Sequence, residues 1–417
     1  MTNKSNISQV LLNHRMLICI FTGFSSGLPL YILISLVPAW LRLEGVDLKA
    51  IGLFALIQLP FTWKFLWSPL FDRYVPPLGR RRGWLILTQI ALLLIIPTFG
   101  YLHPKLDLWA IAYLSIVVAF FSASQDIVLD AYRRELLLDD ELGLGNAIHV
   151  NAYKIAGLVP GALSLVLADH LPWDLVFIIT ALFMLPGILM TLFVAEPELK
   201  GAPKTLKAAV IEPFKEFIGR GIKPALLILS FIFFYKLGDS MATALATPFY
   251  LDMGFSKTEI GLIAKNAGLW PSVFGGLLGG IWMIRLGINR ALWIFGAVQM
   301  IAILGFAWLA VVGHDPIWLA LVIGVEALGV GLGTSAFVAF IARATHPLYT
   351  ATQFALFTSL AAVPRTFANA ATGYMVEWVG WNSFFLICFF MAIPGMLLLV
   401  KVAPWREQEK NHFIAPG

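Results

Sequence analysis

The sequence has little charge and almost no cysteine. Only 13% of its 417 residues are charged, and its two cysteines, Cys19 and Cys388, lie in apolar stretches near opposite ends. A soluble globular protein carries about a quarter charged residues, so water alone could not solvate what this chain leaves outside a core. A cytosolic enzyme, a disordered scaffold and a nucleic-acid-binding protein are therefore excluded. Two distant cysteines build neither a disulfide framework nor a metal site.

Catalytic signatures are also missing. The sequence contains no Gly-x-Ser-x-Gly, P-loop or HExxH pattern, so we expect no enzyme, no cofactor and no metal site. The run from Gly329 to Gly333 resembles half a nucleotide-binding loop, but no strand precedes it, and close helix packing explains it better. All seven histidines fall at expected helix ends or in loops, which argues against a histidine proton relay: His14, His103, His149, His170, His314, His346 and His412.

Long hydrophobic stretches dominate the chain, of which 59% is hydrophobic. A helix needs about 20 mostly apolar residues to cross a bilayer, and irregular backbone cannot face lipid. We therefore expect an all-α integral membrane protein, and its first span is too long for a cleaved signal peptide. Twelve windows qualify, starting near Leu17, Ile51, Trp84, Leu108, Ala147, Leu175, Ala225, Glu259, Ala291, Pro316, Thr352 and Asn382.

Basic residues indicate the orientation, because cytoplasmic loops are enriched in Lys and Arg. With the N-terminus inside, alternate loops place nine arginines in the cytoplasm: Arg73, Arg80, Arg81, Arg82, Arg133, Arg134, Arg285, Arg290 and Arg343. The opposite loops hold Arg42, Lys49, Lys105 and Lys257. Both termini are therefore expected to be cytoplasmic, and the net charge of +5 reflects these loops rather than a nucleic-acid partner.

One long polar stretch divides the twelve spans into six and six. The resulting domains are an N-terminal bundle (1–195), a cytoplasmic linker (196–223), a C-terminal bundle (224–404) and a cytoplasmic tail (405–417). Within the linker, apolar residues from Leu206 to Phe217 recur at helical spacing with lysines between them. Two interpretations stay open, a helix lying on the membrane surface and a solvated linker.

The two halves resemble each other. The segment from Pro38 to Leu53 matches the segment from Pro248 to Leu262 with one deletion, and the offset of about 209 residues carries Trp84 onto Trp293. Six spans per copy give both copies the same orientation in the membrane. A substrate site between the halves, near the midplane, follows from this kind of architecture.

The loop after the second span carries a motif. It contains Asp72-Arg73, then Pro76-Pro77, then Gly79-Arg-Arg-Arg-Gly83. This resembles the loop motif of the major facilitators, with Ser68 where the first glycine is usual and a longer gap before Gly79. The resemblance implies a gate, in which Asp72 and Arg73 act with Arg133 or Arg134 at the cytoplasmic end of the fourth span. The alternative is that the arginines simply anchor the loop inside.

Nine ionisable residues fall inside the expected spans: Lys64, Lys154, Lys236, Lys265, Arg365, Asp126, Asp130, Asp239 and Glu326. Each unpaired charge would cost about 2.5–3.5 kcal/mol at the bilayer centre. Together these costs would exceed the stability of an ordinary fold. We therefore expect most of these groups to face a wet cavity or one another.

Two carboxylates on the fourth span are the first candidates for proton coupling. Asp126 and Asp130 are four residues apart, so they share one helix face. Asp126 has no base within one turn, whereas Asp130 is followed by Arg133 and Arg134, which favours a local ion pair. Asp126 is therefore the preferred proton site. Glu326 either neutralises a neighbour or carries a proton.

Substrate contacts are predicted at the remaining charges. Lys236 and Asp239, three apart, form either a structural pair or a substrate contact. Lys154, Lys265 and Arg365 have no acid within four residues and are expected to hold substrate carboxylates or to pair with other helices. Lys64 lies close to Trp63 and Trp67 and is expected to extend toward the inner surface.

Several runs together resemble the AmpG-type muropeptide permeases, a branch of the major facilitators. They lie in both halves, at residues 23–30, 64–69, 72–77, 79–84, 122–131, 235–239 and 351–356, and the most specific are Ser122-Ala-Ser-Gln-Asp126 and Lys64-Phe-Leu-Trp-Ser-Pro69. The resemblance implies proton-driven import of N-acetylglucosaminyl-anhydro-N-acetylmuramic acid and its peptides across the inner membrane of a Gram-negative bacterium. It also implies a part in cell-wall recycling and β-lactamase induction, an essential Asp126, and a substrate contact at Gln125.

Some members of that branch have two further hydrophobic segments after the twelfth span, whereas this chain has a short polar tail after Trp405. The expected partners are a small sugar–peptide, protons and the lipid bilayer, and the chain is expected to act as a monomer. A carrier of another anionic cargo, such as a siderophore or acyl-CoA, and a non-transporting membrane sensor are the alternatives.

Overall fold

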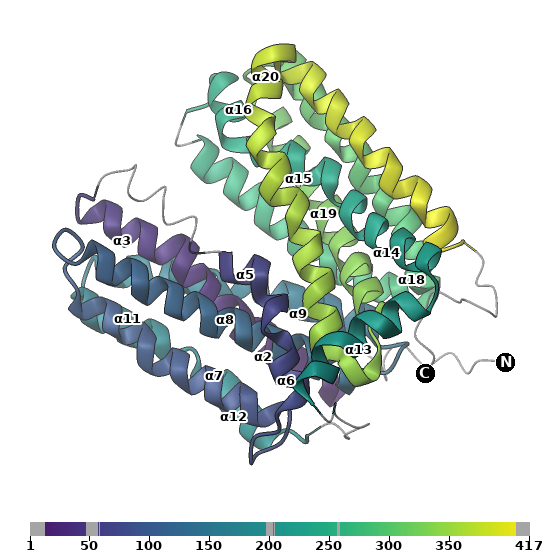
Figure 1. Ribbon diagram of the computed structural model, residues 1–417. Helices are drawn as coiled ribbons and strands as arrows, with labels where there is room; N and C mark the ends of the chain where they lie inside the picture. Colours follow the sequence, from purple (N-terminus) through teal and green to yellow (C-terminus); the bar gives the residue numbers. More distant parts are fainter. Residues whose placement is uncertain are drawn as a thin grey trace. The chain divides into compact units, whose positions relative to one another are not determined.

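The computed structural model describes residues 13–46, 57, 59–196, 203, 205–256 and 259–405, and the side chains at 261, 265 and 364–371 are left aside. Every regular element in these ranges is a helix, with no strand among them (Figure 1). The all-α fold expected from the apolar windows is confirmed.

By its contacts the chain divides into two units. Unit 1 comprises Met1–Leu138, Ile148–Pro213 and His346–Leu356, and unit 2 comprises Asp139–Ala147, Phe214–Thr345 and Phe357–Gly417. Each unit therefore takes one short segment from the other half of the sequence. The linker and tail boundaries stay predictions, since 197–202, 204 and 406–417 lie outside the described residues.

Unit 1 is built from the helices drawn in purple to teal in Figure 1. They are α2 (His14–Tyr31), η1 (Ile32–Leu36), α3 (Val37–Leu43), α5 (Leu59–Trp63), η3 (Lys64–Leu66), α6 (Ser68–Arg73), α7 (Arg82–Ile95), η4 (Ile96–Tyr101), α8 (Leu108–Leu136), most of α9 (Leu142–Ala156), η5 (Val159–Leu163), α10 (Ser164–Ala168), α11 (Trp173–Leu182) and α12 (Leu185–Phe193). Two further helices cross the boundary between the units: α13 (Leu206–Gly219) and α20 (Thr350–Val402), which η7 (Pro347–Tyr349) precedes.

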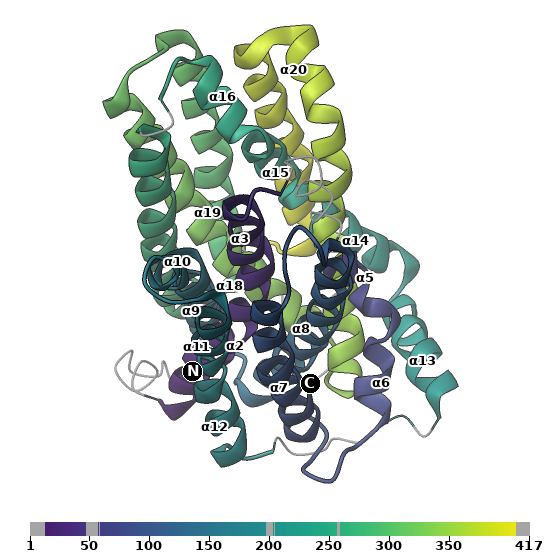
Figure 2. The same ribbon diagram turned by 90° about the vertical axis from the view of Figure 1, so that its left-hand side faces the viewer.

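Unit 2 contains α14 (Ile222–Tyr235), α15 (Leu237–Ala244), α16 (Ala246–Asp252), η6 (Ile260–Ala264), α18 (Lys265–Val312), α19 (Pro316–Ala344) and the rest of α20. Within this unit α18 packs along α19 (Figure 2). Two long helices are interrupted, α18 at Gly287 with φ 74° and α20 at Gly380 with φ 73°. Glycine adopts these positive φ values without a steric penalty.

Nine helical stretches among the described residues are long and apolar enough to cross a membrane. The stretch Leu262–Val312 covers the eighth and ninth predicted spans, which the break at Gly287 separates. In the same way, the break at Gly380 separates the eleventh and twelfth. The second predicted span begins among residues outside the description. The twelve windows are therefore consistent with the observed helices.

The linker segment contains a helix, as one of the two interpretations predicted. α13 is held at two points on its unit 1 side, where Gln353 Nε2 donates to the Pro213 carbonyl at 3.1 Å and the Tyr349 hydroxyl donates to Glu212 Oε2 at 2.8 Å. These bonds fix one face of α13 against the start of α20. Its position on a membrane surface stays a prediction.

Small residues let α2 approach α9 closely within unit 1. A Cβ atom on Gly23 would lie 2.1 Å from the His149 carbonyl oxygen, and one on Gly27 would lie 2.4 Å from the Tyr153 carbonyl oxygen. Both carbonyls belong to helix backbone, which cannot move aside cheaply. The glycines in the run from Gly23 to Leu30 therefore set the distance between these two helices.

This packing predicts an asymmetric response to alanine. Gly27→Ala should lower the free energy of unfolding by about 1–3 kcal/mol through overpacking. Gly161→Ala is the matched control, since its nearest atom would be Ser35 Cβ at 4.0 Å. The control should be neutral or stabilise by up to about 1 kcal/mol through helix propensity. Thermal melting of the purified variants in detergent measures both, and equal melting temperatures would contradict the close contact.

Candidate functional site

A buried ion pair links two membrane spans of unit 1. Lys64 lies where α5 ends and η3 begins, and its ammonium group donates to Asp126 Oδ2 on α8. The Lys64 side chain is 5% exposed. The prediction that Lys64 extends toward the membrane surface is therefore wrong. The chain turns at Lys64 in a way that aims the side chain inward at an acid 62 residues away.

The second carboxylate on α8 joins the same group. Arg133 donates to Asp130 Oδ1 at 2.7 Å, and the Lys64 ammonium lies 3.8 Å from Asp130 Oδ2. One lysine thus reaches both acids, which confirms that Asp126 and Asp130 share a helix face. The local pair between Asp130 and Arg133 is also confirmed. We call Lys64, Asp126, Asp130 and Arg133 the α8 charge cluster.

The α8 charge cluster is balanced, with two cations and two anions when all four groups are ionised. Burying such a set costs far less than burying its members separately, since each charge has a partner within hydrogen-bonding distance or close to it. The two acids differ in access. The Asp126 side chain is 20% exposed and Asp130 only 9%. Asp126 is therefore the carboxylate that a solute or a proton reaches more readily.

Polar side chains from α2 support the cluster. Ser26 donates its hydroxyl to Asp126 Oδ1 at 2.7 Å. Gln125, beside Asp126, donates to the Ser25 carbonyl at 2.6 Å and is fully buried. This places Gln125 in the packing of α8 on α2, and a substrate contact there stays a prediction that the geometry does not favour.

One histidine contradicts the expectation that all seven lie at helix ends or in loops. His149 lies inside α9, is 5% exposed, and contacts the Thr22 hydroxyl through Nδ1 at 3.1 Å. The position of His149 inside a helix was not predicted, because the predicted fifth span started close to it. A buried imidazole is therefore part of the polar interior of unit 1.

The other predicted site residues lie elsewhere. The ammonium of Lys236 lies 3.5 Å from Asp239 Oδ2 in unit 2, which confirms their pairing. Glu326 is buried in α19 at 7% exposure, and Lys154 is half-buried in α9. The side chains of Lys265 and Arg365 lie outside the described residues, so their roles stay predictions.

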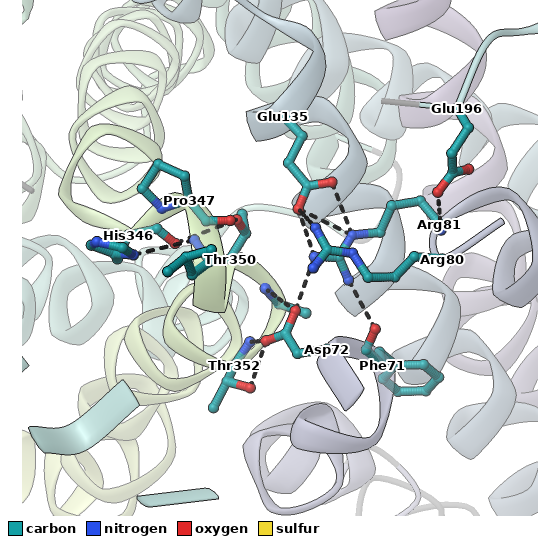
Figure 3. Close-up of polar contacts among 12 residues, drawn as sticks. Phe71, Asp72, Arg80, Arg81, Glu135, Glu196, His346, Pro347, Thr350 and Thr352 are labelled. Atoms are coloured by element: carbon teal, nitrogen blue, oxygen red, sulfur yellow. Dashed lines mark hydrogen bonds and ion pairs between the residues drawn. The ribbon is translucent and has the colours of Figure 1, made fainter. Parts of the chain in front are cut away.

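A second charge cluster lies at the loop between α6 and α7, and Figure 3 shows it. Asp72, the last acid of α6, is completely buried. It accepts hydrogen bonds from the backbone amide of Thr352 at 2.9 Å and from the Thr352 hydroxyl at 2.8 Å. Asp72 thus caps the first turn of α20, where unpaired amides and the helix dipole favour a negative charge.

Arg81 holds Asp72 in place. The Arg81 guanidinium donates to Asp72 Oδ1 at 2.9 Å, to Glu135 Oε1 at 2.6 Å and to the Phe71 carbonyl at 3.1 Å, and its side chain is fully buried (Figure 3). Glu196 accepts the Arg81 backbone amide at 2.7 Å. Burial alone would lower the pKa of Arg81, but the carboxylates of Glu135 and Asp72 raise it above its ordinary value. The guanidinium therefore stays charged.

The predicted gate is partly wrong. Asp72 was expected to pair with Arg133 or Arg134, but it pairs with Arg81, nine residues away. Arg133 instead belongs to the α8 charge cluster, with its guanidinium 5.8 Å from the Phe354 ring centre. Arg73 lies over the ring of Tyr74 at 5.4 Å, and Arg134 is half-buried in the last turn of α8. The physical reason is that the loop folds back, which brings Arg81 closer to Asp72 than α8 arginines can come.

Comparison with known proteins identifies the family. The model of the Major Facilitator Superfamily matches residues 19–368 and 232–416. The chain belongs to the major facilitator superfamily. Among solved structures, this superfamily member is similar to the transporter FucP, with a TM-score of 0.71 and 10% identity over 94% of this chain and 99% of that one. At this identity the likeness shows the fold.

Sequence relatives place this major facilitator in the AmpG-type branch. The anhydromuropeptide permease of Escherichia coli K12 is 42% identical over 95% of this chain and 81% of its own length. The putative transporter AmpG 4 of Rickettsia felis is 32% identical over 94% of this chain and 98% of its own. The resemblance stated from the motifs is confirmed.

The α8 charge cluster predicts a strong coupling between its members. Lys64→Met should destabilise this major facilitator by about 3–5 kcal/mol, because it leaves a buried carboxylate without its partner. Adding Asp126→Leu should recover most of the loss, since replacing both partners of a buried pair is often neutral. Chemical unfolding of the two single variants and the double variant measures this. Additive losses would contradict a direct pair.

The loop cluster predicts a difference between two arginines. Arg81→Ala should cost about 3–5 kcal/mol, because it strands the buried Asp72 and weakens the hold on Glu135. Arg73→Ala is the control in the same loop, and its loss should stay within about 1 kcal/mol. The same unfolding assay compares them, and a similar loss in both would show that Arg81 has no special role.

Proposed function

We propose that the chain is a proton-coupled importer of anhydromuropeptides in the inner membrane of a bacterium, working by alternating access. One observation carries this proposal: the 42% identity with a named anhydromuropeptide permease extends over 95% of the chain. It spans the stretches that contain both Asp126 and Lys236. Both termini are cytoplasmic in this proposal, and the transporting unit is a monomer.

Asp126 is the proposed proton site. It is the more exposed acid of the α8 charge cluster, and its carboxylate has two contacts, a hydrogen bond from the Ser26 hydroxyl and an ion pair with Lys64. A proton on Asp126 removes the charge that Lys64 neutralises. The cluster then carries an excess positive charge, which is unfavourable in a membrane interior.

Lys64 responds to that change. Asp130 lies 3.8 Å from its ammonium group, but Arg133 already neutralises Asp130 at 2.7 Å. The released ammonium therefore attracts a further anion, and the peptide part of an anhydromuropeptide supplies carboxylates. In this mechanism proton uptake and anionic substrate binding favour each other, which is the coupling that a symporter requires.

The contact between Asp72 and the start of α20 is the proposed gate. Asp72 contributes two charge-assisted hydrogen bonds to the first turn of α20, and α20 continues into unit 2 at Phe357. A change at this contact is thereby transmitted along a single helix. Arg81 acts as the positioning residue, since it holds the Asp72 carboxylate in line with the helix end.

One proton supplies enough energy for useful accumulation. An inward proton at 100 mV contributes about 2.3 kcal/mol. Since about 1.4 kcal/mol corresponds to a tenfold ratio, this supports a gradient of about 40-fold for a substrate without net charge. Each negative charge on the substrate offsets the voltage contribution of one proton.

The proposal predicts a separation between exchange and accumulation. Asp126→Asn keeps the shape of the side chain but cannot cycle a proton. It should abolish accumulation of labelled anhydromuropeptide into proteoliposomes driven by a pH gradient, while counterflow between equal pH values remains. Wild-type rates of accumulation in the variant would contradict the role of Asp126.

Two controls test the identity of the substrate and whether the protein transports it. Competition with an excess of siderophore or acyl-CoA should leave anhydromuropeptide uptake unchanged if the cargo assignment holds. Inhibition by either competitor would favour a carrier of another anionic cargo. Binding without any flux in the wild-type protein would instead favour a membrane sensor.

A further inference from the structure

A small cavity lies inside unit 2, away from the α8 charge cluster. Tyr235 and Asp239 line it from the seventh span, Gln299 and Met300 from α18, and Met396 from α20. The space open to the centre of a water-sized sphere is about 10 Å³. That is about the room required by one water molecule, so the cavity is too small for a sugar–peptide.

Two polar atoms at this cavity have no hydrogen-bond partner among the described residues. They are Asp239 Oδ1, an acceptor, and Gln299 Nε2, a donor. Gln299 is only 4% exposed, and leaving a buried amide unpaired is costly. A water molecule in the cavity would satisfy both atoms by accepting from Gln299 Nε2 and donating to Asp239 Oδ1.

The backbone next to the cavity is interrupted. α14 ends at Tyr235, Lys236 has φ −103° and ψ −2°, and α15 begins at Leu237. Asp239 therefore lies in the first turn of a new helix, where a negative charge is favoured. Transporters place coupling ions and substrates at such broken helices.

The neighbouring ion pair is loose. The Lys236 ammonium lies 3.5 Å from Asp239 Oδ2 and forms no hydrogen bond in the described structure. Both side chains are 13% exposed. A pair that is held at this distance leaves the ammonium group available to a competing carboxylate.

We propose that Asp239 is a second proton-binding carboxylate, hydrated by a water molecule on Gln299, and that Lys236 controls it by exchanging Asp239 for a substrate carboxylate. This inference rests on the proposed anhydromuropeptide transport for the identity of the competing anion. The hydrated proton site itself rests only on the geometry of unit 2.

The proton balance is simple. When a substrate carboxylate takes Lys236, the buried Asp239 carboxylate loses its counter-charge, and the neutral acid becomes the favoured form. The cavity water delivers a proton from the aqueous phase to Asp239 Oδ1, one O–H bond forms on Asp239, and one O–H bond of the hydrated proton breaks. When the substrate leaves, Lys236 returns and the proton is released.

No described side chain that lines the cavity offers Asp239 a positive charge in place of Lys236. The Tyr235 hydroxyl faces the cavity region but donates to the Leu292 carbonyl at 3.0 Å. Gln299 on α18 is uncharged, and α20 contributes Ala392 and Met396. Among the described residues that line the cavity, Asp239 has the only carboxyl group, and none has a basic side chain.

Infrared difference spectroscopy of the full-length protein in lipid tests the site directly. A protonated carboxyl group has a C=O band distinct from that of a carboxylate. Titration of the wild type from neutral to acidic pH should produce a band that is absent from the double variant Lys236→Gln/Asp239→Asn. The double variant avoids leaving Lys236 as an unpaired buried charge. Gln299→Leu should shift the band by removing the hydration.

A matched control distinguishes hydration from packing. Gln89 is a fully buried glutamine in unit 1 with both ends hydrogen-bonded, and Gln89→Leu should leave the Asp239 band unchanged. The proposal is overturned if the band persists in the double variant, or if Gln299→Leu leaves its position unchanged.

A second measurement separates this inference from the proposed function. Adding an anhydromuropeptide at constant pH should increase the intensity of the Asp239 band in the wild type. The increase should be smaller in Gln299→Leu. If the pH-dependent band assigned to Asp239 is present but the anhydromuropeptide leaves it unchanged while transport is observed, the exchange at Lys236 is wrong. If no transport is observed, the cargo assignment fails, and the spectroscopic result still decides whether Asp239 binds a proton.

Discussion

Charges inside the membrane must neutralise one another, and this constraint organises both units. In unit 1 a single ammonium group, on Lys64, serves two carboxylates of α8, and Arg133 completes the balance. In unit 2 Lys236 and Asp239 form a looser pair beside a cavity of about one water molecule. A buried charge in a loose ion pair can exchange its partner for another ion. A carrier requires such an exchange when it binds a charged substrate.

The two charge clusters of unit 1 have different roles. The α8 charge cluster is joined through one lysine, and its more exposed acid is the one that we propose as the proton site. The Asp72–Arg81 cluster is closed, because Arg81 is fully buried and its planar guanidinium binds two acids at once. In the proposed mechanism the first changes its charge state, and the second holds a helix end.

The sequence alone predicted the contacts between residues that are close together along one helix. The shared face of Asp126 and Asp130, the pair of Asp130 with Arg133 and the pair of Lys236 with Asp239 all follow from spacings of three or four residues along a helix. The partners of Lys64 and of Asp72 lie 62 and 280 residues away. Helical period carries no information about which distant helix lies opposite, so those two contacts required the structure. The water-sized cavity at Gln299 depends on four helices, α14, α15, α18 and α20, and was not predicted for the same reason.

The central claim is that a buried carboxylate takes up a proton together with the substrate. The most direct measurement is the pH outside proteoliposomes when anhydromuropeptide is added in the absence of any imposed gradient. The account predicts that the external medium becomes more alkaline as substrate enters, and that this change disappears in Asp126→Asn. Substrate entry by the wild-type protein without any change in external pH would contradict it.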